Sequence, residues 1–185
     1  MKFKIFKKAI LACLFALMLS SCLPDNVTVY DGPLLVEFSN LSGNHLVNYS
    51  WSSTGRFWNT EIRGELPDTA VQVQLIGPHQ TLPLKIGYYV APVVYRNISK
   101  NRLEPEQPEG VEGTDWVMLT TTAVEGVDYN LLDGGEIVFQ PNSSFAKLRL
   151  STSPTGDRLM FIVLTEMDLQ PSINARVFRL RIRPL

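Results

Sequence analysis

The sequence has few residues of the types that build thiol or metal chemistry. Cys13 and Cys22 are the only cysteines among 185 residues, and His45 and His79 are the only histidines. No H-E-x-x-H, G-x-S-x-G, P-loop or G-x-G-x-x-G motif occurs. The scarcity of cysteine excludes a disulfide-rich scaffold. We therefore expect a chain that is not an enzyme and has no cofactor.

A hydrophobic run long enough to span a membrane is also missing. The longest apolar stretch, Ala9–Leu19, has eleven residues, whereas a spanning helix needs about 20. Four lysines precede this stretch, and Leu19-Ser20-Ser21-Cys22 follows it. This arrangement is typical of a bacterial lipoprotein signal peptide over residues 1–21, with Cys22 as the lipid-modified residue.

Lipid modification of Cys22 has chemical and spatial consequences. Cys13 is removed with the signal peptide, so the mature chain has neither a free thiol nor a disulfide. Each buried acyl methylene contributes about 0.8 kcal/mol, so two or three chains give stable anchoring. We expect an outer-membrane lipid anchor, with the lipid bilayer as a partner.

Removal of the signal peptide also changes the net charge. Residues 1–21 hold four of the 17 basic residues and no acidic residue. The mature chain therefore has 13 basic and 18 acidic residues, a net charge of −5. Nucleic acid is not an expected partner.

The mature chain divides into three segments by composition. Residues 22–33 form a mostly polar tether that ends at Asp31-Gly32-Pro33. Residues 34–68 contain a first strand and a polar, aromatic-containing segment. Residues 69–185 form the main domain.

Alternation of apolar and polar residues dominates the main domain. It is clearest in Val71–Leu75, Ala146–Leu150 and Phe178–Ile182. Such alternation is typical of strands with one buried face, and turn residues separate the runs. The pattern favours an all-β, antiparallel, Ig-like β-sandwich of about seven to eight strands, with a closed barrel as the alternative.

One mid-domain segment resembles a known family. Thr122–Tyr129 reads TAVEGVDY, similar to an element of the Calx-beta-like, immunoglobulin-type domains of Bacteroidetes cell-envelope lipoproteins, many of unknown function. In physical terms, Gly126 permits a tight turn, Asp128 caps backbone amides, and Tyr129 buries its ring. The element is therefore interpreted as a fold marker.

The resemblance implies two further expectations. Some members bind calcium through carboxylates at strand ends, which makes Glu125, Asp128, Asp133 and Asp168 candidate ligands; ordinary turn acids are the alternative. Surface export in this group uses several acidic residues just after the cysteine, and Leu23-Pro24-Asp25-Asn26 offers only one. The face of the membrane, cell surface or periplasm, therefore stays undecided.

Aromatic residues in the polar segment form a second candidate site. Tyr49, Trp51 and Trp58 lie among serines and asparagines, a mixture that stacks on sugar rings and bonds their hydroxyls. The alternative is that they plug one end of the sandwich.

Two smaller features complete the pattern. Arg176, Arg179, Arg181 and Arg183 form a basic stripe, either an anion-binding face, shared with Lys147 and Arg149, or a charged surface that discourages edge pairing. Asp68-Thr69-Ala70 resembles a short O-glycosylation motif. Together the features predict a non-catalytic binding or adhesion role, glycan-related by analogy with similar lipoproteins. The alternative is a structural or accessory subunit that packs against another envelope protein.

Overall fold

The computed structural model describes residues 31–39, 47–51, 58–99, 102–107, 115–173 and 175–185. Every element in these ranges is a strand, β1 to β14 in chain order. Across the same ranges, no helix has the length and apolarity to cross a bilayer. The prediction of an all-β fold is confirmed.

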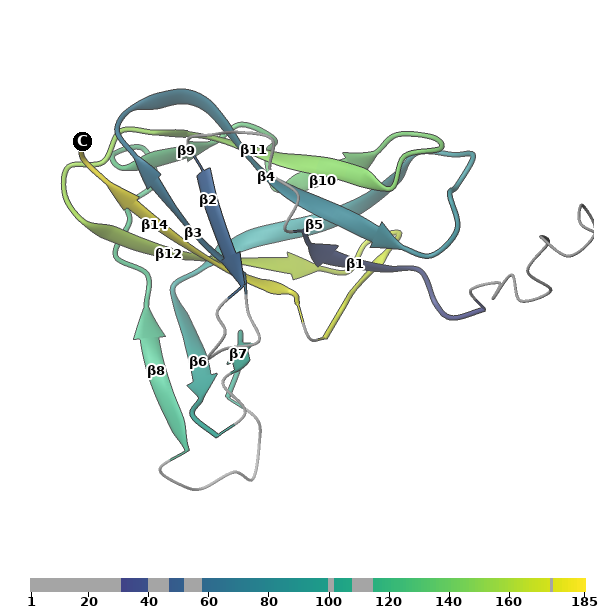
Figure 1. The fold of residues 1–185 in the computed structure, drawn as a ribbon, viewed down its shortest axis with the longest axis horizontal. Helices are drawn as coiled ribbons and strands as arrows, with labels where there is room; N and C mark the ends of the chain where they lie inside the picture. The colour runs from purple at the N-terminus through teal and green to yellow at the C-terminus, as the bar shows by residue number, and fades with distance from the viewer. Residues whose placement is uncertain (1–30, 40–46, 52–57, 100–101, 108–114, 174) are drawn as a thin grey trace, which may run out of the picture. The chain divides into compact units, whose positions relative to one another are not determined.

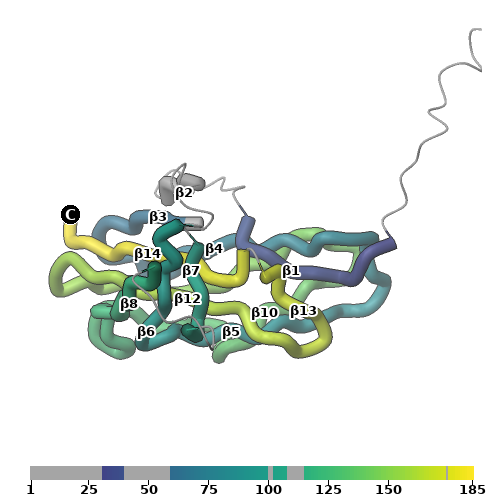
Figure 2. The backbone as a smooth tube through the Cα atoms, turned by 90° about the horizontal axis from the view of Figure 1, so that it is seen from below, coloured from purple at the N-terminus to yellow at the C-terminus, as the bar shows by residue number. Residues whose placement is uncertain are grey.

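Two large sheets make up most of the described structure (Figures 1 and 2). The first has the order β13 (Gln170–Pro171), β1 (Leu35–Phe38), β4 (Leu66–Ile76), β11 (Phe145–Thr152) and β9 (Tyr129–Leu131). The second has the order β10 (Glu136–Phe139), β5 (Leu84–Ala91), β12 (Arg158–Thr165), β14 (Val177–Arg183), β3 (Trp58–Arg63) and β2 (Val47–Trp51).

A third, smaller sheet follows from a bend after β5. Its order is β7 (Arg102–Glu104), β6 (Val93–Asn97) and β8 (Trp116–Thr120). Only Pro92 separates β5 from β6, and Figure 1 shows β6 running out of the second sheet with β8 beside it. We call these three strands the arm.

The alternating runs explain the pairing of the two large sheets. In β4, Val71, Val73 and Leu75 are buried, whereas Gln72 and Gln74 between them are partly exposed. The same pattern holds in β11 and β14, so each sheet turns one apolar face inward.

The inward faces meet in a single core that includes a pair of aromatic rings. The centroids of Phe38 and Phe178 lie 4.9 Å apart with the rings tilted by 41°. Such a pair is worth about 0.5–1.5 kcal/mol beyond its buried area. The pair joins β1 to β14, one strand from each sheet.

Strand β12 departs from the alternating pattern because both of its faces are covered. Met160, Ile162 and Leu164 face the main core, while Phe161 and Val163 belong to a second apolar cluster. That cluster also contains Val94 and Leu103 of the arm. The arm therefore packs against the outer face of β12 and buries it.

The structure confirms the predicted β-sandwich but differs from the prediction in the number and pairing of its strands. Both large sheets have edge strands, so the barrel alternative is wrong. There are more strands than the seven or eight predicted, and two pairings, β1–β13 and β3–β14, are parallel. Strands from residues 34–68 and from residues 69–185 share the same two sheets.

The candidate O-glycosylation motif lies within β4. The side chain of Thr69 is only 3% exposed, because Thr69 faces the interior next to Leu150 of β11. A glycosyltransferase has no access to this hydroxyl in the folded domain, so the interpretation of the motif as a modification site is wrong for the folded state.

Candidate functional site

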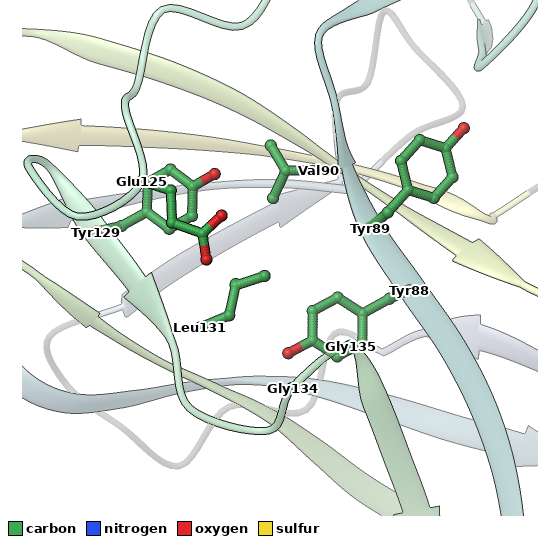
Figure 3. A pocket seen from close by; sticks show the side chains of 8 residues that line it. All are labelled: Tyr88, Tyr89, Val90, Glu125, Tyr129, Leu131, Gly134 and Gly135. Atoms are coloured by element: carbon green, nitrogen blue, oxygen red, sulfur yellow. The ribbon is translucent and has the colours of Figure 1, made fainter.

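A pocket of about 470 Å³ opens between the two large sheets on the side where β5 and β9 lie. It is lined by Tyr88–Val90 of β5, by Glu125, Tyr129 and Leu131, and by Gly134 and Gly135 (Figure 3). We call it the slot. Its volume lies within the range of about 300–1,000 Å³ that is usual for ligand pockets.

The slot exists because β10 covers only half of β5. The last ladder contact is the hydrogen bond from the Tyr88 N–H to the Gly135 carbonyl oxygen, at 2.9 Å. Gly134 and Gly135 then take φ values of 63° and 89°, a left-handed conformation that glycine adopts without a steric penalty. The chain turns away there toward β9 and leaves the rest of β5 without a neighbour on that side.

Two tyrosine rings form the inner wall of the slot. Tyr88 is 5% exposed and Tyr129 is 4% exposed. The Tyr88 hydroxyl is buried and forms no hydrogen bond of normal geometry among the described residues, although the Gly135 backbone lies near enough to lower its pKa. Burial, and secondarily the charge of Asp133, outweigh this effect and raise the pKa of Tyr88 to about 12. The hydroxyl is therefore protonated at neutral pH, and it lies behind the surface of the slot.

The carboxylate of Glu125 stands at the outer rim. Glu125 is exposed, and among the described residues it forms no ion pair. The next residue, Gly126, has a φ of 79° and donates its N–H to the Tyr129 carbonyl oxygen at 2.8 Å. This confirms the tight turn predicted for Gly126 and places Glu125 beside Tyr129 (Figure 3).

The buried carboxylate of Asp128 stabilises this turn through hydrogen bonds. Its side chain is fully buried and accepts bonds from the Val124 N–H at 3.0 Å and from the N–H and hydroxyl of Thr155 at 3.0 and 2.9 Å. Arg158 adds an ion pair at 3.3 Å. The amide-capping role predicted for Asp128 is confirmed, and it holds the wall of the slot in place.

The four candidate calcium ligands do not meet. Asp128 is occupied by the bonds above, Asp133 accepts the Arg149 N–H, and Asp168 accepts the Lys85 N–H at 2.9 Å. Glu125 alone faces the slot. Within the described ranges, no group of three or more His, Cys, Asp or Glu residues is placed to hold a metal. The geometry thus gives the calcium hypothesis no support.

The aromatic candidates lie at the opposite edge of the second sheet. Trp51 of β2 pairs in register with Trp58 of β3, and Tyr49 pairs with Thr60. Their side chains lie outside the described part of the chain, so the choice between a sugar platform and a plug stays a prediction. The slot, near β5, is a separate candidate.

Three of the four arginines in the basic stripe form ion pairs with carboxylates, whereas Arg179 forms none among the described residues. Arg181 and Arg183 of β14 form ion pairs with Glu61 and Asp157, and Arg176 pairs with Glu104. Lys147 and Arg149 belong to β11 of the other sheet. The idea of one shared anion-binding face is therefore wrong, because the two sets do not lie on one sheet.

The sequence does not indicate the slot. Tyr88 and Tyr89 are neighbours in β5, and any half-buried strand turns one of two neighbouring aromatics inward and the other outward. The sequence of Glu125–Tyr129 indicates a turn and a buried ring. Nothing local indicates that Tyr88 and Tyr129 come together across the two sheets.

Comparisons with known proteins give no family. No family model matches the chain, and no curated protein matches it. Among solved structures, the class 5 fimbriae chaperone CfaA is similar with a TM-score of 0.36 and 11% identity over 74% of this chain. The PapD-like domain 7 of human CEP192 is similar with a TM-score of 0.34 and 11% sequence identity, and the match covers 88% of this chain and 98% of that domain. The match covers 56% of the chaperone. Similarity this distant carries no inference about ligand or activity.

Proposed function

We propose that the chain is an outer-membrane lipoprotein, anchored through Cys22, whose β-sandwich binds a glycan in the slot without catalysing a reaction. The observation that carries the binding proposal is the slot itself, in which the exposed, unpaired Glu125 carboxylate stands beside the apolar side chains of Val90 and Leu131. The Tyr88 hydroxyl lies just behind this wall without a hydrogen bond of normal geometry to any described residue. A ligand that shifts the wall enough to reach this hydroxyl recovers part of the roughly 1–3 kcal/mol that an unpaired buried hydroxyl costs.

Sugar chemistry suits the rest of the lining. A sugar ring presents hydroxyls around its rim and C–H groups on its faces, and the slot offers both kinds of complement. Leu131 and Val90 are apolar, whereas Glu125 and the tyrosine hydroxyls accept or donate hydrogen bonds. The lining mixes polar and apolar surface, with polar surface the larger share, which suits a ligand that has many hydroxyls.

Replacing Tyr88 with phenylalanine separates ligand binding from folding. Tyr88→Phe removes only the unpaired hydroxyl, so we expect the free energy of unfolding to rise by about 1 kcal/mol. Affinity for the glycan is expected to fall by about tenfold, the equivalent of one hydrogen bond. Urea denaturation and a glycan array on the full chain in detergent measure the two effects.

Tyr95→Phe, a change on the arm away from the slot, is the matched control and is expected to leave glycan affinity unchanged. Equal glycan affinity for Tyr88→Phe and the unchanged protein would place the ligand elsewhere. An array on which the unchanged protein binds no sugar would contradict glycan binding altogether.

The anchoring half of the proposal has its own test. Cys22→Ser removes the thiol that carries the lipid, so we expect loss of radiolabelled palmitate from the chain in a bacterial host. The protein is also expected to move from the membrane fraction to the soluble fraction, because a single cysteine provides the attachment. Cys13→Ser is the matched control and retains the label. Label retained by Cys22→Ser would refute the lipid site.

An accessory subunit of another envelope protein is the second candidate, and the arm favours it. Val117 and Met118 on the edge strand β8 are 42% and 60% exposed. Exposed apolar side chains on an open edge are typical of contact surfaces. Two results together would favour this second function over the first. The protein would bind no sugar on the glycan array, and a membrane protein that co-purifies with the unchanged chain would be lost in Met118→Glu.

A further inference from the structure

Backbone groups of β5 add to the polar lining of the slot. The Leu164 N–H donates to the Arg176 carbonyl oxygen, toward β14. Because peptide directions alternate along a strand, Ile162 also bonds toward β14. Val90 lies opposite Ile162, so this pair exchanges no hydrogen bonds. The N–H and carbonyl of Val90 consequently point to the other side of β5.

Beyond the ladder with β10, that side of β5 is bonded at two points among the described residues. The Tyr88 N–H is bonded to Gly135, and the Pro92 carbonyl accepts the Thr121 N–H at 2.9 Å. Between these two bonds, the carbonyl oxygens of Tyr88 and Val90 and the N–H of Val90 face the slot. The gap is three residues long, which suits a small ligand better than an added strand.

The polar groups of the slot are mostly acceptors. Two backbone carbonyls and the Glu125 carboxylate accept, Val90 supplies one N–H, and the tyrosine hydroxyls act either way. None of the residues that line the slot in the described chain is basic. The Glu125 carboxylate lines the slot at its rim, whereas Asp133 lies outside the lining and accepts the Arg149 N–H. The slot therefore carries excess acceptors and negative charge.

We propose that the slot selects a sugar bearing a protonated amine over neutral and N-acetylated sugars. This inference rests on the glycan-binding function proposed above. An ammonium group supplies three donors and one positive charge, and it meets the unpaired Glu125 carboxylate at the rim. The ring hydroxyls meet the Val90 peptide, and the C–H face of the ring lies against Leu131.

The test uses three probes that differ only at one ring position. They are the β-1,4-linked trimers of glucose, N-acetylglucosamine and glucosamine, titrated calorimetrically into the full chain in detergent at pH 6 and low salt. We expect the glucosamine trimer to bind about tenfold more tightly than the other two, because a charge-assisted hydrogen bond is worth more than a neutral one. The preference is expected to shrink in 0.5 M salt.

Glu125→Gln is expected to abolish the preference and leave the weaker binding of the glucose trimer. Glu166→Gln, at an exposed position beyond the other end of β12, is the matched control and retains the preference. Equal affinity for all three trimers, or a preference that survives Glu125→Gln, overturns the amine selectivity but leaves glycan binding intact. Failure of all three to bind, together with silence on the array, overturns both proposals.

Discussion

Asp128→Ala is expected to lower the free energy of unfolding by about 3 kcal/mol or more, because removal of a buried acceptor leaves its donors unpaired. The Asp128 carboxylate is inaccessible and joins the turn at Val124 to the β11–β12 turn at Thr155. In the alanine variant, two backbone N–H groups lose their acceptor. Urea denaturation followed by tryptophan fluorescence measures the loss.

Graded variants sharpen this prediction. Thr155→Val removes one of the donors and is expected to cost about 1 kcal/mol. Asp157→Asn removes an exposed carboxylate that pairs with Arg181, and its effect is expected to be the smallest of the three. If Asp128→Ala destabilised the domain no more than Asp157→Asn, the buried cap would not hold the turn.

The pH dependence of the free energy of unfolding provides a second test of the role of Asp128. Burial alone would raise the pKa of Asp128, but the hydrogen bonds from Thr155 and Val124 and the charge of Arg158 outweigh it and lower the pKa below its ordinary value. The stabilisation is therefore present above about pH 4, the unfolded pKa, and is lost as pH falls through the folded pKa. The stability difference between the unchanged protein and Asp128→Ala is expected to narrow below pH 4.

Glu104→Gln is expected to destabilise the attachment of the arm by about 3 kcal/mol, since breaking a buried ion pair from one side leaves charge uncompensated. Glu104 is the last residue of β7 and is 4% exposed. Its carboxylate bonds Arg176, just before β14, at 3.0 Å and also pairs with Arg102. Glutamine leaves two half-buried guanidinium groups facing each other without an anion.

Limited proteolysis and thermal unfolding report this change, with cleavage expected first in the arm. An apolar replacement of all three residues, Arg102→Met with Glu104→Leu and Arg176→Met, provides the contrast. It is expected to be neutral or stabilising, because it removes the desolvation cost along with the pair. A melting temperature unchanged in Glu104→Gln would refute the idea that this triad holds the arm.

Strands with one solvent-exposed face and one buried face could be predicted from the sequence. Val71–Leu75, Ala146–Leu150 and Phe178–Ile182 alternate, and all three lie within observed strands. Strand β3 could not be predicted in this way. Its sequence, WNTEIR, is mostly polar, because Glu61 pairs with Arg181 and Arg183 of a strand far along the chain.

The slot illustrates a second limit of sequence analysis. The cap at Asp128 is local, formed across a few residues, and could be predicted from the turn chemistry. The environment of the Tyr88 hydroxyl depends on how the two sheets pack and on β10, which pairs with β5 only over Leu84–Gly87. Neither feature can be inferred from the residues near Tyr88. Likewise, the double burial of β12 depends on the arm, which a run of apolar residues cannot indicate.

The parallel pairing of β3 with β14 also bears on when the domain can form during synthesis. Trp58 lies beside Phe178 and Arg63 beside Arg183, so the paired residues are 178 − 58 = 120 positions apart in the chain. Closing so long a loop is slow, and folds dominated by such distant pairs fold in milliseconds to seconds. A nascent chain that ends before Val177 lacks β14, so β3 has only β2 as a partner and one side of β12 has none. Until translation is almost finished, the second sheet therefore consists of two separate pieces, β10–β5–β12 and β2–β3, each with an unpaired edge.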